Sequence, residues 1–418
     1  MKQVTLTGVS VTGNRGAEAM LTTAIGRIRD SHPDTIFNVF TIYPKEDRKL
    51  IDDDRIRIFS STPFYLSFIL FPLSILFSII QYLRLGCFDS FFPKAVTSIA
   101  NSSAFIDLSG ISFMDGRIKF LPYNILTILP AIFLGVPVIK GAQAMGPFNN
   151  PLNRLSAELL LKKCNRVFAR GRFTMQYLRG LGLNNVVKTT DIAFLHEFND
   201  TLTEENNEYT KYITKKISGF KSNGQLIVGI CPSSVVYKKA GSKYIKLLVA
   251  IIENILNSGH SVLLFPNATR ENHMGKLHNN DLPVIQEIVD FFRSDGGHQL
   301  KHIVYIDRNI NTVSIKKLIN SIDLAIISRF HAMINCLSLG IPPIVVGWSE
   351  KYLEIMESFN MEEWVFDYTV ENKDEIVEKL DFLIAQRQEI ATHIKKKWPE
   401  IKKLAAIQIN CINSFLSQ

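Results

Sequence analysis

Cysteine is scarce in this chain of 418 residues, and the cysteines lie far apart. The five of them are Cys87, Cys164, Cys231, Cys336 and Cys411. Because their number is odd and no Cys-x-x-Cys pair occurs, the sequence supports neither a disulfide framework nor a cysteine-based metal site. We therefore expect the protein to work in a reducing, cytoplasmic compartment.

Three other patterns are also missing. The segment 1–8 leads directly into a predicted strand and lacks the regions of a secretory signal peptide, so we expect no export. No Asp-x-Asp pair stands in a suitable turn and no cysteine–histidine cluster occurs, so we predict neither a metal nor a cofactor. No basic run is interleaved with aromatic residues, and residues 395–397 are interpreted as a solvated helix face, so we expect no nucleic-acid partner.

The remaining composition is that of a folded chain with a positive charge. It is 46% hydrophobic and 21% charged, and its length predicts two or three domains. Lysine and arginine number 47 against 39 acidic residues, which gives a net charge of +8. This balance favours anionic partners but does not choose among nucleotides, sugar phosphates and lipid headgroups.

The most informative stretch is a strand–helix–strand unit near the C-terminal end. Its apolar pattern predicts a buried strand over 324–327, a helix over 332–339 and a second strand over 344–346. Gly340 is expected to end the helix. In open parallel sheets the turns of such units lie at the carboxyl edge, where ligands bind.

Three basic side chains follow the strands of this unit. Arg329 and His331 come after the first strand, and Lys351 follows the second. A guanidinium, an imidazole and an ammonium group at one edge predict a site for phosphate or carboxylate. Taken singly, each is also explained as a solvated or helix-capping residue, so the hypothesis depends on their joint spacing.

A glycine-rich turn near the N-terminus joins a predicted strand to a helix that ends at about Arg29. The turn and the helix start contain Asn14, Arg15 and Glu18, and glycines let backbone amides approach a ligand closely. The glycine spacing does not fit a dinucleotide site. We expect substrate contact here, with a plain tight turn as the alternative.

Polar residues follow other predicted strands of the first half as well. Asp107 and Ser109 follow a strand that begins at Ala104, and Arg170 follows a strand that begins at Arg166. Each is also explained as an ordinary connecting loop. Together they indicate that these strand ends lie at the edge of a binding cleft.

One long apolar stretch interrupts the first half. Residues 63–83 carry no charged side chain and are about long enough to span a bilayer. Pro72 lies in the middle, and the predicted strands on both sides belong to one sheet, so a single crossing is disfavoured. We predict a membrane-surface or re-entrant helical pair, with residues 120–133 as a second apolar element; a buried helix of the first domain is the alternative.

The alternation of strands and helices predicts an α/β fold with two doubly wound, Rossmann-like domains facing a cleft, as in the glycosyltransferase B architecture. The polar region 199–223 marks the connection between them. We predict an N-terminal domain over 1–205 that carries the apolar insertion, a C-terminal domain over 206–385, and a helical tail over 386–418 that is broken near Pro399.

The chain resembles the polysaccharide pyruvyl transferase family over nearly its whole length. The residues that carry the resemblance are Gly13-Asn14-Arg15-Gly16-Ala17-Glu18-Ala19, Gly146-Pro147-Phe148, Arg170 with Thr174 and the Leu181-Gly182 and Asp191 segment, and Ser328-Arg329-Phe330-His331 followed by Gly340-Ile341-Pro342 and Lys351. One segment departs from the family pattern, because Gly171 and Arg172 stand where the family has more acidic residues. A role that belongs to that acidic neighbour is therefore absent here.

The resemblance implies transfer of the pyruvyl group of phosphoenolpyruvate to two hydroxyls of a sugar in a surface-polysaccharide precursor of the capsule or exopolysaccharide kind. The products are a cyclic ketal and phosphate, and no cofactor is needed beyond the donor substrate. Arg170, Arg329, His331 and Lys351 match family positions associated with donor binding or catalysis. We expect His331 to act as general acid or base, and the two arginines and Lys351 to bind the donor's phosphate and carboxylate.

The acceptor is expected over the first domain, near Asn14, Arg15, Glu18, Asp107 and Ser109. The apolar stretch suggests a lipid-linked acceptor and peripheral association with the inner face of the cell membrane. The sequence leaves open whether the chain forms a homo-oligomer.

Two rival functions also stay open. A nucleotide-sugar glycosyltransferase would use the same kind of cleft, with the basic residues as a diphosphate clamp. A non-catalytic scaffold of a polysaccharide complex would keep the fold and use the basic cluster to bind lipid headgroups.

Overall fold

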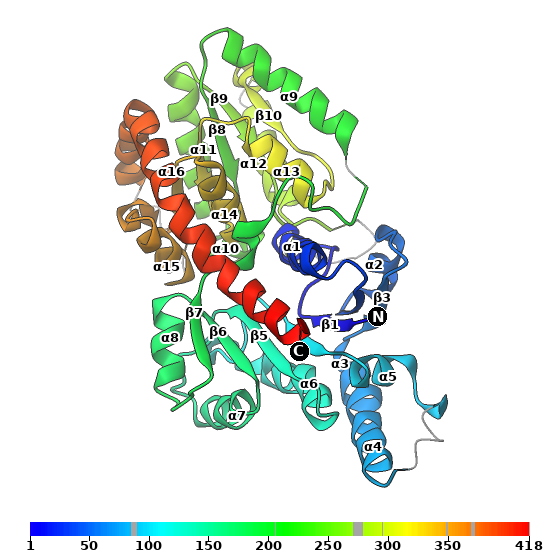
Figure 1. Ribbon diagram of the computed structural model, residues 1–418. Helices are drawn as coiled ribbons and strands as arrows, with labels where there is room; N and C mark the ends of the chain where they lie inside the picture. The colour runs from blue at the N-terminus through cyan, green and yellow to red at the C-terminus, as the bar shows by residue number, and fades with distance from the viewer. Residues whose placement is uncertain are drawn as a thin grey trace. The chain divides into compact units, whose positions relative to one another are not determined.

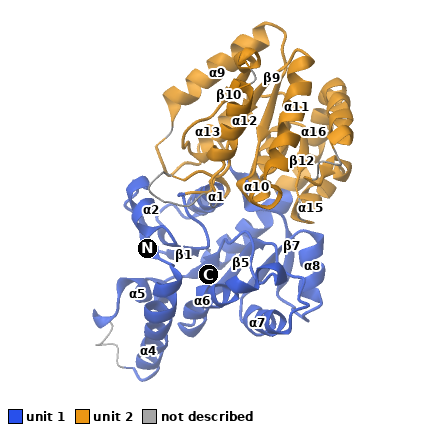
Figure 2. Cartoon of the chain, turned by 180° about the vertical axis from the view of Figure 1, so that it is seen from behind, with its two compact units in different colours: residues 1–12, 17–196, 403–418 blue, residues 13–16, 197–402 orange. Residues whose placement is uncertain are grey.

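The computed structural model describes residues 1–84, 90–204, 206–270, 279–294, 296–347, 350–368 and 373–417. Figure 1 labels the helices and strands. Contacts divide the chain into two compact units, which have different colours in Figure 2. The first unit contains Met1–Thr12, Ala17–His196 and Lys403–Gln418, and the second contains Gly13–Gly16 and Glu197–Lys402. In the predicted division each domain was one continuous segment of the chain. The contacts instead group the 13–16 turn with the second unit, and the end of the last helix with the first.

The first unit is built on a parallel sheet of seven strands in the order β3-β2-β1-β4-β5-β6-β7. The strands are β1 Gln3–Thr7, β2 Ile36–Thr41, β3 Ile56–Ser60, β4 Ala104–Asp107, β5 Val138–Gln143, β6 Arg166–Arg170 and β7 Val186–Thr189. Their Val-, Ile- and Phe-rich sequences are typical of strands that are covered on both faces. The order reverses between β1 and β4, which makes this pair the switch point of the sheet.

Helices connect these strands. They are α1 Arg15–Ser31, α2 Pro44–Leu50, α3 Pro63–Tyr65, η1 Leu66–Leu70, α4 Phe71–Tyr82, α5 Lys94–Ala100, η3 Asp115–Phe120, α6 Leu121–Phe133, α7 Pro151–Leu161, α8 Arg172–Arg179 and η4 Ile192–Leu195. One hydrophobic cluster joins the inner sides of α4 to α8 with the sheet, and it contains Phe77, Val96, Ile128, Ala157 and Leu178. Burial of such side chains stabilises the fold by roughly 25 cal/mol for each Å² of apolar surface.

Pro72 is accommodated by a change of helical pitch. It lies in the first turn of α4, directly after η1, which is a π-helix. The Phe71 amide donates to the Leu66 carbonyl, five residues back. Since proline has no amide hydrogen to continue an α-helical ladder, this wider turn keeps residues 63–82 in one continuous helical segment.

The second unit repeats the doubly wound plan with six parallel strands in the order β10-β9-β8-β11-β12-β13. The strands are β8 Ile227–Cys231, β9 Ser261–Leu264, β10 Ile303–Tyr305, β11 Leu324–Ile327, β12 Pro343–Val346 and β13 Val365–Phe366. The helices are α9 Asn207–Ser222, α10 Ser234–Ala240, α11 Ser242–Asn257, α12 Leu282–Ser294, η6 His298–His302, α13 Thr312–Ile319, α14 Phe330–Leu339, α15 Glu350–Ser358, η7 Glu362–Trp364 and α16 Lys373–Ser417. The predicted strand–helix–strand unit is thus confirmed as β11, α14 and β12, and Gly340 ends α14 with a φ of 72°.

The predicted break near Pro399 is wrong. α16 is a single helix that contains Pro399 and continues to Ser417. Apolar side chains on both sides of the proline, including Ile394 and Ile401, are buried. Packing of this face therefore outweighs the cost of one lost backbone hydrogen bond. Beyond it, the Gln408 amide group donates to the Thr190 carbonyl of the first unit at 3.0 Å.

Candidate active site

The second unit has its polar groups at the switch point of its sheet. β8 and β11 are neighbours, and their register pairs Cys231 with Ile327. The segments that follow, which contain Ser234 and Arg329, therefore leave the sheet side by side at its carboxyl edge. Ligands of open α/β sheets bind at such points.

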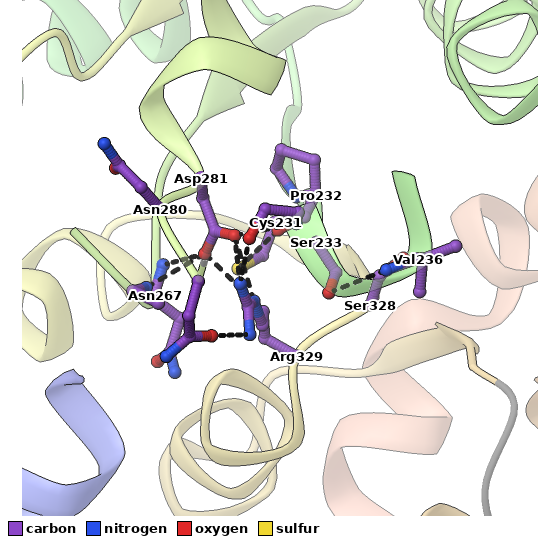
Figure 3. Close-up of polar contacts among 12 residues, drawn as sticks. Cys231, Pro232, Ser233, Val236, Asn267, Asn280, Asp281, Ser328 and Arg329 are labelled. Atoms are coloured by element: carbon purple, nitrogen blue, oxygen red, sulfur yellow. Dashed lines mark hydrogen bonds and ion pairs between the residues drawn. The ribbon is translucent and has the colours of Figure 1, made fainter. Parts of the chain in front are cut away.

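Arg329 at this edge forms a buried ion pair with Asp281. Its Nε donates to both Asp281 carboxylate oxygens at 3.0 Å, and one Nη also donates to this carboxylate. The Asp281 side chain is fully buried and that of Arg329 is 12% exposed. Figure 3 shows the two side chains pointing toward each other. Further guanidinium hydrogen bonds run to Asn279 Oδ1 at 2.8 Å and to Ser234 Oγ at 2.9 Å.

Asp281 connects three loops of this edge. Its Oδ1 accepts from the Ser234 amide after β8 at 2.9 Å. Its Oδ2 accepts from the amides of Asn267 and Ala268 after β9, at 3.1 and 2.9 Å, as Figure 3 also shows for Asn267. Together with Arg329 after β11, these contacts satisfy the carboxylate and fix the loops relative to one another.

The ion pair keeps the Arg329 guanidinium charged. Burial by itself lowers the pKa of the Arg329 guanidinium, but the Asp281 carboxylate outweighs this effect, and the pKa lies above its ordinary value. Burial also raises the pKa of Tyr352. The neutral Tyr352 hydroxyl donates to the Ser328 carbonyl at 3.0 Å, which holds the residue before Arg329 in place.

The 13–16 turn packs against this network and against His331. The Arg15 amide donates to the Asn267 carbonyl at 3.1 Å, and the Gly16 amide donates to Asn14 Oδ1 at 2.9 Å. A Cβ atom on Gly16 would lie 2.0 Å from His331 Nδ1. Only a glycine lets the backbone approach the imidazole this closely.

Lys351 and His331 both contact the ring of Phe330. The Lys351 ammonium lies 5.1 Å from the Phe330 ring centre and 5.2 Å from that of Tyr352. The His331 ring meets Phe330 edge-on with a centroid distance of 5.2 Å. The ammonium of Lys351 and the imidazole of His331 thus both lie beside the Phe330 ring, at the first turn of α14.

The first unit also has a polar cluster at its switch point. Lys140 Nζ lies 2.5 Å from Asp107 Oδ2, and both side chains are buried. Asp107 Oδ1 accepts from the Ser109 amide at 2.8 Å. A Cβ atom on Gly8, whose φ is 81°, would lie 2.2 Å from Ser109 Oγ. The ends of β1 and β4 therefore pack tightly around a carboxylate that is already paired.

Arg170 belongs to a second ion pair of the first unit. It is the last residue of β6, and its Nη1 lies 2.9 Å from Asp191 Oδ2. Both side chains are buried, and Asp191 Oδ1 also accepts from the Ala193 amide at 2.9 Å. Arg170 therefore has a carboxylate partner within the protein, as Arg329 does.

The structure groups the predicted residues differently from the sequence. Asn14 and Arg15, which were expected beside Asp107 and Ser109, lie in the second unit with His331, whereas Glu18 is buried in the first turns of α1 in the first unit. Among the described residues, no group of three His, Cys, Asp or Glu side chains is arranged to hold a metal ion.

Two charged residues of these clusters were missed from the sequence. Lys140 lies inside a strand, and Asp281 precedes α12 in an Asn-Asn-Asp run that is typical of a helix start. The partner of Asp281 lies 48 residues away along the chain. Nothing in the local pattern indicates this contact.

Comparisons with known proteins give the fold and the family. No curated sequence matches the chain. Among solved structures, the UDP-GlcNAc 2-epimerase of Neisseria meningitidis bound to UDP-GlcNAc superposes with a TM-score of 0.58 at 12% identity, covering 100% of both chains. HepE of Anabaena, in complex with UDP and glucose, gives 0.54 at 12% identity over 100% of both chains. A glycosyltransferase of Rickettsia africae gives 0.57 at 12% identity over 99% of both chains.

These likenesses confirm the predicted glycosyltransferase B-like fold with two Rossmann-like domains. The sequence pattern of the family described as polysaccharide pyruvyl transferase matches residues 14–350, which include the 13–16 turn from Asn14 onward, both arginines and the β11–α14 unit. This span is most of the chain. The protein therefore belongs to the polysaccharide pyruvyl transferase family.

Proposed function

We propose that the protein transfers the pyruvyl group of phosphoenolpyruvate onto two hydroxyls of a sugar in a surface-polysaccharide precursor. The observation that carries the proposal is the grouping of His331, Lys351 and the 13–16 turn around the paired Arg329 at the second unit's switch point. A small donor with a phosphate and a carboxylate fits a site that offers an imidazole, an ammonium and oriented amides. Family membership supports the same reaction class.

The reaction balances without a cofactor. The first sugar hydroxyl adds across the enol double bond, so that its oxygen bonds to the central carbon and a proton reaches the methylene carbon. The second hydroxyl then bonds to the same carbon, and the carbon–phosphate oxygen bond breaks. A cyclic ketal and inorganic phosphate result. Each step needs a proton donor or acceptor and stabilisation of the departing charge.

His331 is proposed as the group that moves the proton. An imidazole serves as acid or base near neutral pH. Close packing against Gly16 and Phe330 fixes the ring, which a proton transfer in a defined direction requires. Lys351 would face the departing phosphate as a point charge.

Arg329 is proposed to make fewer hydrogen bonds to the donor than a bidentate clamp would. A guanidinium has five N–H groups. Asp281, Ser234 and Asn279 engage Nε, both hydrogens of one Nη and one hydrogen of the other. Among the residues that the structure describes, no partner is assigned to the fifth N–H, which we propose for the donor. Arg329 would thus contribute one hydrogen bond and, through Asp281, the position of the loops around the donor.

The remaining residues divide by unit. Asn14 and Arg15 are proposed on the donor side, because their turn bonds to Asn267 and packs on His331. Asp107 and Ser109 are kept as the acceptor side. Arg170, with Asp191 as its partner, would orient the end of β6.

The test is a coupled measurement of phosphate and product. The purified full chain is incubated with phosphoenolpyruvate and a panel of sugar acceptors, lipid-linked ones included, and inorganic phosphate and acceptor mass are followed. We expect one phosphate for each pyruvylated acceptor. His331→Gln should lower kcat by at least about 100-fold, whereas His298→Gln, at an exposed position of the same unit, should not. Phosphate release without acceptor modification, or full activity of His331→Gln, would contradict the proposal.

A nucleotide-sugar glycosyltransferase is the second candidate. It is favoured by one observation, namely that HepE of Anabaena, which shares the fold, is solved with UDP and glucose. Sugar transfer from UDP- or GDP-sugars, with no response to phosphoenolpyruvate, would select it.

A further inference from the structure

The first unit carries a long apolar helical segment that is mostly not buried. Residues Pro63–Tyr82, which form α3, η1 and α4, make a segment of 20 residues. Its most apolar stretch of 18 residues has a mean hydropathy of 2.1, and only 22% of that stretch is buried. A helix in the core of a soluble protein is mostly buried. The alternative of a buried core helix therefore does not describe this segment.

The exposed residues of the segment form one stripe. Phe64 and Phe68 are 68% and 69% exposed, and Leu76, Ile79 and Leu83 follow on the same side at intervals of three or four residues after Pro72. The opposite side packs into the core. Its members are Leu66, Leu70, Ser74 and Phe77. The segment is thus attached to the sheet by one side and presents an uncharged side to the surroundings.

Two neighbouring helices extend this surface. α4 packs on α6, where the Phe71 and Phe133 rings lie 5.8 Å apart and Ser78 Oγ donates to the Phe133 carbonyl at 2.8 Å. α7 contacts α6 in turn, and its exposed leucines are spaced by three and four residues. Figures 1 and 2 show α4, α6 and α7 at the same end of the first unit. We name this surface the apolar helix face, made of Phe64, Phe68, Leu76, Ile79, Leu83, Phe120, Phe133, Leu152, Leu155 and Leu159.

The charges around the apolar helix face are mostly basic. No acidic residue occurs between Asp54 and Asp89 or between Asp115 and Glu158. The basic residues in or beside these intervals include Arg84, Lys94, Arg117 and Lys119. The last two lie over the half-exposed ring of Phe120, at 4.8 and 5.1 Å from its centre. Glu158 on α7 is paired with Lys162 at 2.6 Å.

We propose that the apolar helix face docks onto the surface of an anionic phospholipid membrane. The exposed phenylalanines and leucines enter the boundary between headgroups and acyl chains, and the basic residues at the edges contact lipid phosphates. The helices lie in the plane of the membrane. A crossing would remove Leu66, Leu70 and Phe77 from the core to which they belong.

A second copy of the chain is a less suitable occupant. A symmetric contact would place the same face of both copies together, and therefore basic residues against basic residues. An anionic bilayer neutralises them instead. The proposal does not depend on the donor of the reaction, since the face belongs to the first unit and contains none of the donor-side residues.

The test is co-sedimentation of the purified full chain with vesicles of phosphatidylcholine alone and of phosphatidylcholine with one third phosphatidylglycerol. We expect binding to the anionic vesicles that weakens as salt is raised. The triple variant Phe64→Ser, Phe68→Ser, Leu76→Ser should bind them at least tenfold more weakly. Arg117→Gln with Lys119→Gln should lose most of the preference for anionic vesicles. Tyr212→Ser, at a 53% exposed aromatic position of the second unit, is the matched control and should bind as the wild type does.

Three results would overturn the proposal. The first is that the wild type does not bind vesicles. The second is that the triple variant binds vesicles as well as the wild type does. The third is that light scattering shows a wild-type dimer and a monomeric triple variant, while neither protein binds vesicles. Retention on vesicles after carbonate extraction would contradict the in-plane arrangement. Phosphate release with a water-soluble acceptor is measured on the same samples. It should be equal in wild type and triple variant, so that failure of membrane docking and failure of the proposed reaction are told apart.

Discussion

The carboxylate of Asp281 and the guanidinium of Arg329 form a buried ion pair at the point where the second sheet reverses its strand order. Arg329 looks from the sequence like a free receptor for an anion. In the structure it donates to Asp281 and Ser234, and Asp281 in turn accepts from the amides of the loops after β8 and β9. This arrangement assigns Arg329 mainly to the positioning of the site, and we propose that His331 and Lys351 act on the donor.

Breaking this pair should destabilise the protein strongly. Asp281→Asn leaves a buried guanidinium without its carboxylate, and we expect a loss of about 3–5 kcal/mol in the free energy of unfolding. Chemical denaturation of Asp281→Asn, Arg329→Gln and the double variant gives the coupling free energy between the two side chains. Asp290→Asn removes the partner of Arg293 at a site where both side chains are 54% exposed, and should cost under about 1 kcal/mol. Equal losses at the two sites would show that the Asp281 pair is not special.

The approach of Gly16 to His331 predicts a coupling between these positions. Gly16→Ala places a methyl group where the imidazole stands, and we expect a loss of about 1–3 kcal/mol of stability together with reduced activity. In a His331→Ala background the clash disappears, so the same substitution should cost much less stability. Gly219→Ala, where the added carbon meets nothing within 4 Å, is the control. An identical cost of Gly16→Ala in both backgrounds would disprove the contact.

Asp47 predicts a pH dependence of stability. Its buried carboxylate accepts from the Thr12 amide at 3.0 Å, next to the 13–16 turn. Burial raises its pKa above the ordinary 3.8, against the effect of this and other hydrogen bonds. Since the folded state then holds the proton more tightly, this residue's contribution to stability falls as the pH rises from about 3.8 through the folded pKa.

Asp47→Asn should remove this dependence. Denaturation from about pH 4 to about pH 7 should show Asp47→Asn becoming more stable relative to the wild type as the pH rises. Asp381→Asn, at an exposed position of α16, should follow the wild type at every pH. A constant difference between Asp47→Asn and the wild type would contradict the burial argument.

The cysteines beside the two sheets should be unreactive in the folded protein. Burial raises the pKa of Cys164 to about 12 and also raises those of Cys231 and Cys336. Because the thiolate is the reactive form, iodoacetamide at about pH 8 should leave these three residues unmodified until denaturant is added. Peptide mass spectrometry measures this directly. Rapid native modification of Cys231 would instead indicate an accessible nucleophile beside the Asp281 network.

Periodicity and turn residues were enough to predict most of the architecture. The strands and helices around Arg329 were predicted within a few residues, because β11 and α14 differ in length and apolar spacing and Gly340 marks the helix end. The exposed apolar segment at 63–82 was also visible as an uncharged run. Such features depend on neighbours in the sequence.

The features that were missed depend on contacts between distant residues. The pairs of Arg329 with Asp281 and of Arg170 with Asp191 give the two arginines internal partners, and no local pattern indicates either pairing. The packing of Gly16 on His331 joins the beginning of the chain to the second unit. Pro399 suggested a break by its local rule, but packing of the helix around it prevailed. Local patterns give the elements, and the partners of charged side chains emerge only from the fold.

The most direct test of the proposed reaction is a thermal-shift titration of the purified protein with phosphoenolpyruvate, in parallel with UDP- and GDP-sugars. A ligand that binds only the folded state stabilises it, by about 2.7 kcal/mol at a concentration of 100 times Kd. We predict saturable stabilisation by phosphoenolpyruvate alone, weakened in Lys351→Met and His331→Gln and retained in His298→Gln. Stabilisation by a nucleotide sugar with none by phosphoenolpyruvate would contradict the account and make the basic residues a diphosphate site.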